Sequence, residues 1–344
     1  MPLLIHKSWV VFVYAVTISV ESILIEFLTA TFQEISSIIL SSISITLAGM
    51  MLLAVAFFIK KKRILTLFSK TWKNLTLASF LLAIGIFTWY DAISRIGASK
   101  EVLIAGPLEI VIVVVFARIF LSEKLYRIQI IGIILALIGF LMALASGGGG
   151  GGTANDLLLD NSSTNTEINS LSRLTITTVG NIEAIVSAFG FAIGVLFLTK
   201  LVSLHSSIEI SGASMFISGL ILVGIMLGFL STPFDISSVI ESFTSWQQKP
   251  PSINIIIILI LFSLLPFFGS LCYLTGLSRV GASITATIGS SSILITVLLQ
   301  TILKELGIVS NLPQNIFLAI LGGVLGFLGI YIIHMHNHNL TIGL

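Results

Sequence analysis

The chain has 344 residues, of which 56% are apolar and only 9% are charged, and its formal net charge is +2. Soluble domains carry about 25% charged residues, so this composition excludes a protein whose whole surface faces water. The small net charge, with no basic stripe, also argues against a nucleic-acid partner. The lipid bilayer is therefore the expected partner, and the predicted fold class is all-α and integral to the membrane.

Apolar runs that could cross a bilayer follow one another along the chain. A span needs roughly 20 apolar residues, and inside lipid it is expected to be helical, because every backbone polar group must be paired within the segment. The predicted spans, in chain order, are 9–30, 36–59, 75–94, 98–121, 127–146, 180–202, 208–230, 252–275, 281–303 and 314–334. The expected architecture is about ten transmembrane helices.

A polar segment divides the chain into two parts. Residues 147–178 begin with a run of glycines and continue with many Asn, Ser and Thr residues. Such a composition is typical of a flexible linker. The sequence therefore predicts two membrane domains, residues 1–146 and residues 179–344, with the linker between them.

The basic residues predict the orientation of the spans. The run Lys60–Arg63 ends the second predicted span, and basic residues are enriched in cytoplasmic loops. This places both termini in the cytoplasm and the glycine-rich linker outside. The predicted localisation is the cell membrane.

The two parts contain matching sequences. Residues 94–99 read SRIGAS and residues 278–283 read SRVGAS, and Trp89 and Tyr273 precede them at the same spacing. Since five spans per part is an odd number, the parts must cross the membrane in opposite directions. Two inverted five-helix repeats are therefore expected, an arrangement that recurs in secondary transporters.

A second match consists of small residues. The spacing of Gly132, Ala136 and Gly139 in the fifth predicted span is repeated by Gly322, Gly326 and Gly329 in the tenth. Small residues at these intervals let two helices approach closely. We expect these seams to pack against neighbouring helices or against a second copy in a homodimer.

Taken together, these motifs resemble the EamA type of the drug/metabolite transporter superfamily. The matching stretches are Trp89–Ser99, Gly106-Pro107 and Ser122-Glu123-Lys124 in the first part, and Tyr273–Ser283 and Lys304-Glu305 in the second. The resemblance implies ten spans in two five-span repeats and the transport of small metabolites, often amino acids or amphipathic compounds. The second part differs in having Ser291 where the first has Pro107.

Glu109 is the first candidate for a transport site. It lies near the centre of the fourth predicted span, two residues after Pro107. A carboxylate at that depth costs roughly 2.5–3.5 kcal/mol on insertion scales, and the proline loosens the helix. Glu109 is expected to bind substrate or carry a proton; the alternative is an interhelical hydrogen bond without a role in transport.

Further candidates are polar or aromatic residues within the spans, namely Glu21, Tyr14, Trp89, Tyr273, Ser290 and Ser291. Glu21 and Tyr14 share a helix face, while the aromatic pair could instead anchor spans at the membrane interface. The two serines could bond to backbone carbonyls rather than substrate. Other acidic residues near the predicted outer ends are expected to be solvated or to cap helices: Glu26, Asp91, Glu101 and Glu183.

The sequence thus predicts a secondary transporter that works by alternating access on a small metabolite or amphipathic compound, with proton coupling left open. One alternative is a sugar-phosphate or nucleotide-sugar exchanger, although the spans hold only Arg118 and Lys200 to meet phosphate. The other alternative is a non-transporting membrane scaffold. No enzyme motif is found and no cofactor or metal is predicted, since the histidines near the C-terminus have no rigid frame.

Overall fold

The computed structural model describes residues 2–32, 35–121, 127–146, 166–202, 204–231, 253–280, 285, 288–307, 313 and 315–342. Within these ranges the chain forms ten long helices and no strand. They are α1 (Pro2–Thr31), α2 (Ser37–Lys70), α3 (Trp72–Ile96), α4 (Ala98–Leu121), α5 (Arg127–Ala145), α6 (Thr166–Val202), α7 (Ser207–Ser231), α9 (Ile253–Val280), α11 (Ser291–Glu305) and α12 (Ile316–Ile342).

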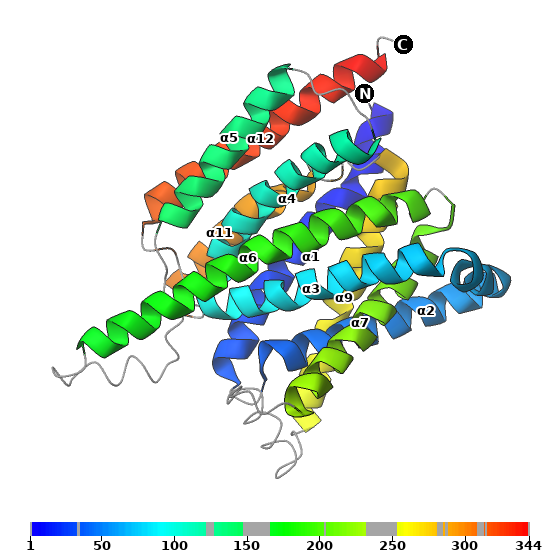
Figure 1. The fold of residues 1–344 in the computed structure, drawn as a ribbon, viewed down its shortest axis with the longest axis horizontal. Coiled ribbons are helices and arrows are strands. Elements are labelled where there is room, and N and C mark those ends of the chain that lie inside the picture. The colour runs from blue at the N-terminus through cyan, green and yellow to red at the C-terminus, as the bar shows by residue number, and fades with distance from the viewer. Residues whose placement is uncertain are drawn as a thin grey trace.

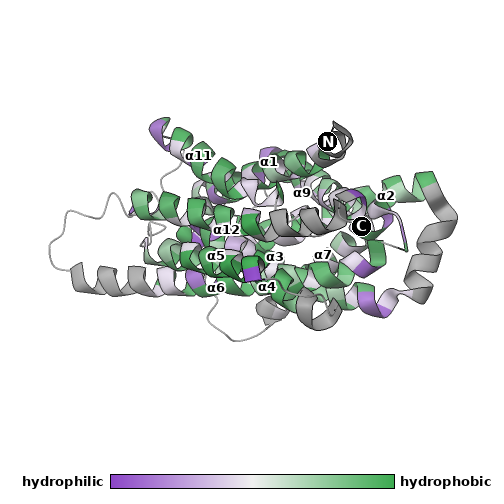
Figure 2. Ribbon diagram, turned by 90° about the horizontal axis from the view of Figure 1, so that it is seen from above, coloured by the Kyte–Doolittle hydropathy of each residue, from purple (hydrophilic) through white to green (hydrophobic). Residues whose placement is uncertain are grey.

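Six of the helices are long and apolar enough to cross a membrane: α1, α2, α3, α6, α7 and α9. Two shorter apolar stretches lie in α5 and α12. Large apolar side chains such as Phe58 and Phe317 are exposed on the outside of the bundle, and Figure 2 shows hydrophobic residues along most helices. Such a surface is stable in lipid and not in water, so the chain is a multi-pass membrane protein.

One boundary differs from that expected. Residues 166–178 were predicted as linker but form the first part of α6, while residues 147–165 lie outside the described ranges. Helix α11 begins at Ser291, after a turn at Ser290, and residues 281–284, 286 and 287 of the predicted ninth span lie outside the described ranges.

The helices pack as a bundle with a regular pattern of neighbours. Helix α3 packs along α6, α2 along α7, α5 along α12 and α1 along α9. The α5–α12 pair forms one edge of the bundle and the α2–α7 pair lies at the opposite edge, with α1, α4 and α6 between them (Figure 1). The beginning of α1 and the end of α12 lie on the same side of the bundle (Figure 1).

The small-residue seams bring α5 and α12 into backbone contact. A Cβ atom added to Gly139 would lie 2.5 Å from the carbonyl oxygen of Gly322 and 2.5 Å from the backbone nitrogen of Gly326. One added to Gly329 would lie as close to the backbones of Gly132 and Ala136. The two seams therefore pack against each other, so a second copy of the chain is not needed to cover them.

This close approach predicts that a side chain in the seam destabilises the protein. Replacing Gly139 with Val should force α5 and α12 apart and lower the free energy of unfolding by about 1–3 kcal/mol, the usual cost of overpacking. Thermal unfolding of the purified protein measures the loss. Gly224→Val is the matched control, because a Cβ on Gly224 would meet no atom within 4 Å. An equal loss of stability in both variants would contradict the conclusion that α5 and α12 are in backbone contact at Gly139.

Candidate functional site

A cavity of about 190 Å³ lies inside the bundle. Residues from α1, α2, α3 and α4 line it on one side, and residues from α6, α7, α9 and α11 complete it. A volume of this size holds several waters or one small organic molecule. The cavity therefore lies between the two parts of the chain and is the natural candidate for a binding site.

Three carboxylates line the cavity: Glu21 on α1, and Glu101 and Glu109 on α4. Among the described residues that line it there is no Lys, Arg or His. Five of the seven residues predicted as site candidates are lining residues, namely Glu109, Glu21, Tyr14, Trp89 and Tyr273. Tertiary folding thus gathers side chains that are far apart in the sequence around one acidic space.

Glu109 occupies the middle of α4, just beyond Pro107, the proline inside this helix. Its side chain lines the same cavity as those of Tyr14 and Tyr273. The rings of these tyrosines contact each other, with centroids 4.8 Å apart and planes tilted by 47°. Helices α1 and α9 therefore meet at this pair of aromatic rings, and the carboxylate of Glu109 on α4 lines the same cavity.

Glu101 was expected to be solvated or to cap a helix; it lies in the first turn of α4 but is only 1% exposed and lines the cavity. Its Oε2 accepts a hydrogen bond of 3.0 Å from Nε1 of Trp89, and its Oε1 accepts one of 3.4 Å from Oγ of Ser187. Steps of four residues connect Glu101 to Ala105 and Ala105 to Glu109 on one helix face. That spacing could have identified Glu101 from the sequence.

Glu21 belongs to a chain of buried polar groups. The hydroxyl of Tyr90 donates a hydrogen bond of 2.8 Å to Oε1 of Glu21 and lies 3.4 Å from Oγ of Ser44. Trp89, next to Tyr90, is 7% exposed, so the alternative that it anchors α3 at the membrane interface is wrong. Trp89 and Tyr90 instead lie inside the bundle.

Ser290 and Ser291 do not line the cavity, whereas the next residue, Ser292, does. Ser291 donates a hydrogen bond of 2.6 Å to the carbonyl of Ile288, and the carbonyl of Ser292 accepts one of 3.1 Å from Ser19. Neighbouring residues at the start of α11 point in different directions around the helix axis, so Ser292 can face the cavity while Ser291 does not. The sequence did not reveal how this helix is rotated.

Glu26 is also buried, at 3% exposure, and not solvated as predicted. Its Oε2 accepts hydrogen bonds from the backbone nitrogen of Ala98, at 2.8 Å, and from Nε2 of Gln300, at 2.6 Å. The side-chain oxygen of Gln300 accepts a further bond of 2.7 Å from the backbone nitrogen of Ser99. This cluster joins α1, the start of α4, and α11.

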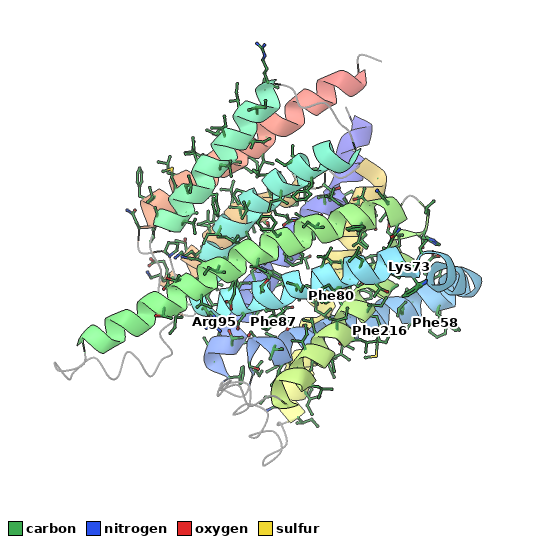
Figure 3. All side chains as sticks on the ribbon, in the orientation of Figure 1. Phe58, Lys73, Phe80, Phe87, Arg95 and Phe216 are labelled. Atoms are coloured by element: carbon green, nitrogen blue, oxygen red, sulfur yellow. The ribbon has the colours of Figure 1, made fainter. Side chains whose placement is uncertain are left out.

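A second cluster joins α2, α3 and α6 at the end of α3 where Arg95 lies, opposite the end with Lys73 (Figure 3). Arg95 pairs with Asp91 at 2.8 Å and with Glu183 at 3.1 Å, and Ser37 donates a hydrogen bond of 2.5 Å to Asp91. The predicted outer acidic residues are therefore partners in contacts between helices.

Comparison with known proteins assigns the chain to a protein family. The family model of the EamA-like transporter family matches residues 7–145 and again residues 178–335. The chain belongs to the EamA-like transporter family. The family resemblance inferred from the sequence is thereby confirmed, and the EamA-like chain is a multi-pass membrane transporter of the drug/metabolite transporter superfamily.

Solved structures share the EamA-like fold at low sequence identity. One of them, a crystal structure of a protein that is 13% identical, superposes with a TM-score of 0.54 over 95% of this chain and 98% of the other. This likeness shows the overall fold alone. No curated protein sequence matches the chain at a significant level.

The hydrogen bond to Glu21 makes a prediction about stability. Tyr90→Phe removes the hydroxyl and leaves a buried carboxylate short of a donor, which typically costs about 1–3 kcal/mol. A lower unfolding temperature of the purified variant is expected. Tyr331→Phe is the matched control because Tyr331 is 45% exposed. If both variants unfold like the wild type, the contact does not stabilise the fold.

Proposed function

We propose that this EamA-like protein is a secondary transporter that moves a small metabolite or amphipathic compound across the cell membrane by alternating access. The observation that carries the proposal is the cavity between the two family-matched parts, with its carboxylates inside the bundle. Charged side chains at membrane depth are costly and mark substrate or ion pathways. The cavity is the substrate site in this proposal.

The neighbour pattern supports an inverted repeat. If α1 to α5 correspond in order to α6, α7, α9, α11 and α12, the α3–α6 pair becomes α9–α1 and the α4–α6 pair becomes α11–α1. Both of these pairs are packed in the structure. Under the same correspondence, the α2–α7 pair and the α5–α12 pair each map onto themselves. Two halves related in this way can rock around a shared site and expose it to either side.

The polar clusters support a closed end near Arg95. The Glu26–Gln300 contact, the Arg95–Glu183 ion pair and the Glu101–Ser187 contact each join one half to the other. Five of these six residues lie in the half of their helix that leads to this end of the bundle, and Ser187 lies just past the middle of α6. In the proposed cycle these contacts hold the cavity shut on that side and separate when that side opens.

Glu109 is the residue proposed to couple transport to protons. A carboxylate that loses its water on burial is stabilised by a bound proton or a bound cation, so it can exchange one for the other. The sugar-phosphate alternative has less support, because phosphate recognition uses Lys or Arg and none lines the cavity among the described residues.

Transport is tested in proteoliposomes with radiolabelled amino acids and organic cations, each with and without a pH gradient. We expect gradient-sensitive flux for at least one compound, and a loss of roughly tenfold or more in Glu109→Gln, the value of a charged hydrogen bond. Glu305→Gln, an exposed acidic residue on α11, should behave as wild type. Flux with the same gradient dependence in Glu109→Gln would remove Glu109 from the mechanism.

Passage through the cavity has its own test. Gly269 lines the cavity, and a Cβ there would meet only Thr17, at 3.6 Å. Gly269→Phe should therefore fill the space without forcing the backbone apart, and should abolish flux of the compound identified above. Gly224→Phe, on a side of α7 with open space, is the control. Undiminished flux in Gly269→Phe would show that substrate takes another route.

Orientation is tested by labelling single cysteines in a Cys272→Ser background. Thr31 ends α1 and Asn74 lies near the start of α3, and both are exposed. With cytoplasmic termini, a membrane-impermeant maleimide added to intact cells should label Thr31→Cys, and should label Asn74→Cys only after the membrane is opened. The reverse pattern would invert the proposed topology.

A further inference from the structure

The chemistry of the cavity carries information about the ligand. Its charged lining consists of three carboxylates, and no basic side chain of the described residues lines it. Arg95 pairs with Asp91 and Glu183 outside the cavity, and the buried Lys100 is not a lining residue. Unlike charges attract strongly where water is excluded, so the lining favours a cation and opposes an anion.

Among the described residues, only one of the three lining carboxylates accepts no hydrogen bond. Glu21 accepts a hydrogen bond from Tyr90, and Glu101 accepts two, from Trp89 and Ser187. Within the part of the chain that the structure describes, no hydrogen bond or ion pair engages Glu109. A buried carboxylate is stabilised by a charged partner, and Glu109 is the one placed to receive a partner from the ligand.

The surroundings of Glu109 suit an ammonium group. The contacting rings of Tyr14 and Tyr273 line the same cavity and stand near this carboxylate. Aromatic faces attract organic cations, and rings beside a carboxylate recognise quaternary ammonium groups. The rest of the wall is largely apolar, with Leu82, Ile86, Phe191, Val195 and Met215 among its residues.

We propose that the cavity binds a small amphipathic organic cation, with its charged head held by Glu109 beside the contacting rings of Tyr14 and Tyr273 and its apolar body against the wall formed by α3, α6 and α7. This deepens the proposed function, on which it rests in taking the cavity as the substrate site. A free amino acid does not fit this class, because its carboxylate would enter an acidic space with no basic partner among the described lining residues.

The test measures equilibrium binding of radiolabelled benzyltrimethylammonium to the full chain in nanodiscs at one fixed pH. This probe has a permanent charge and a single aromatic ring. Saturable binding is expected, weakened more than about tenfold in Glu109→Gln, as for a lost charged contact. Glu109→Asp, which keeps the charge, should bind more tightly than Glu109→Gln, and Glu305→Gln should bind as wild type.

The aromatic contribution is tested by a second pair of variants. Tyr273→Phe keeps the ring and should retain binding, whereas Tyr273→Leu should weaken it by roughly five- to tenfold, the usual value of a cation–π contact. Weakening in Tyr273→Phe as large as in Tyr273→Leu would show that the hydroxyl, not the ring, is needed. Thermal unfolding of each variant verifies that it is folded.

Competition decides the ligand class. Excess unlabelled probe should displace the label, and equal concentrations of benzoate or phenylalanine should not. The inference is overturned if folded wild-type protein shows no saturable binding, if Glu109→Gln binds unchanged, or if benzoate or phenylalanine displaces the probe equally well. Flux of an anion or zwitterion without cation binding would support the proposed transport function and reject an organic cation as the ligand. Cation binding without any flux would support the proposed ligand class and reject the transport function.

Discussion

The cost of holding a carboxylate away from water organises the interior of this protein. Inside a membrane bundle such a group must find donors or a charge. Tyr90 provides the donor for Glu21, Gln300 and the start of α4 provide them for Glu26, and Trp89 with Ser187 provides them for Glu101. Each of these contacts joins different helices, so satisfying the carboxylates also sets how the helices meet.

Close packing of small residues makes these contacts between helices possible. Gly139 and Gly329 let α5 and α12 touch at the backbone, and Gly85 and Gly190 do the same for α3 and α6. In lipid there is no hydrophobic force between helices, so such contacts and polar bonds hold them together. The α3–α6 contact brings Trp89 and Ser187 within reach of one carboxylate and so completes part of the cavity wall.

The fold is more symmetric than the chemistry. Helix neighbours exchange under the correspondence between the halves, but all three carboxylates that line the cavity come from the first half. The second half contributes Tyr273, Phe191 and other largely apolar surface to the same space. Carboxylates from one half beside an apolar wall to which both halves contribute suit an amphipathic molecule with a charged head and an apolar body.

Hydropathy and spacing are local properties of a chain, and they determined the helical membrane class and the candidate Glu109 without tertiary information, while the resemblance of short motifs indicated the family. The same patterns did not distinguish the buried Glu26 and Glu101 from solvated residues at span ends, nor Ser292 from Ser290 and Ser291. Each of these depends on which neighbour a helix face meets and on how the helix is rotated. Only tertiary packing decided that Gln300 reaches Glu26 and that Tyr14 meets Tyr273, because these partners lie more than 250 residues apart and sequence periodicity carries no information about such contacts.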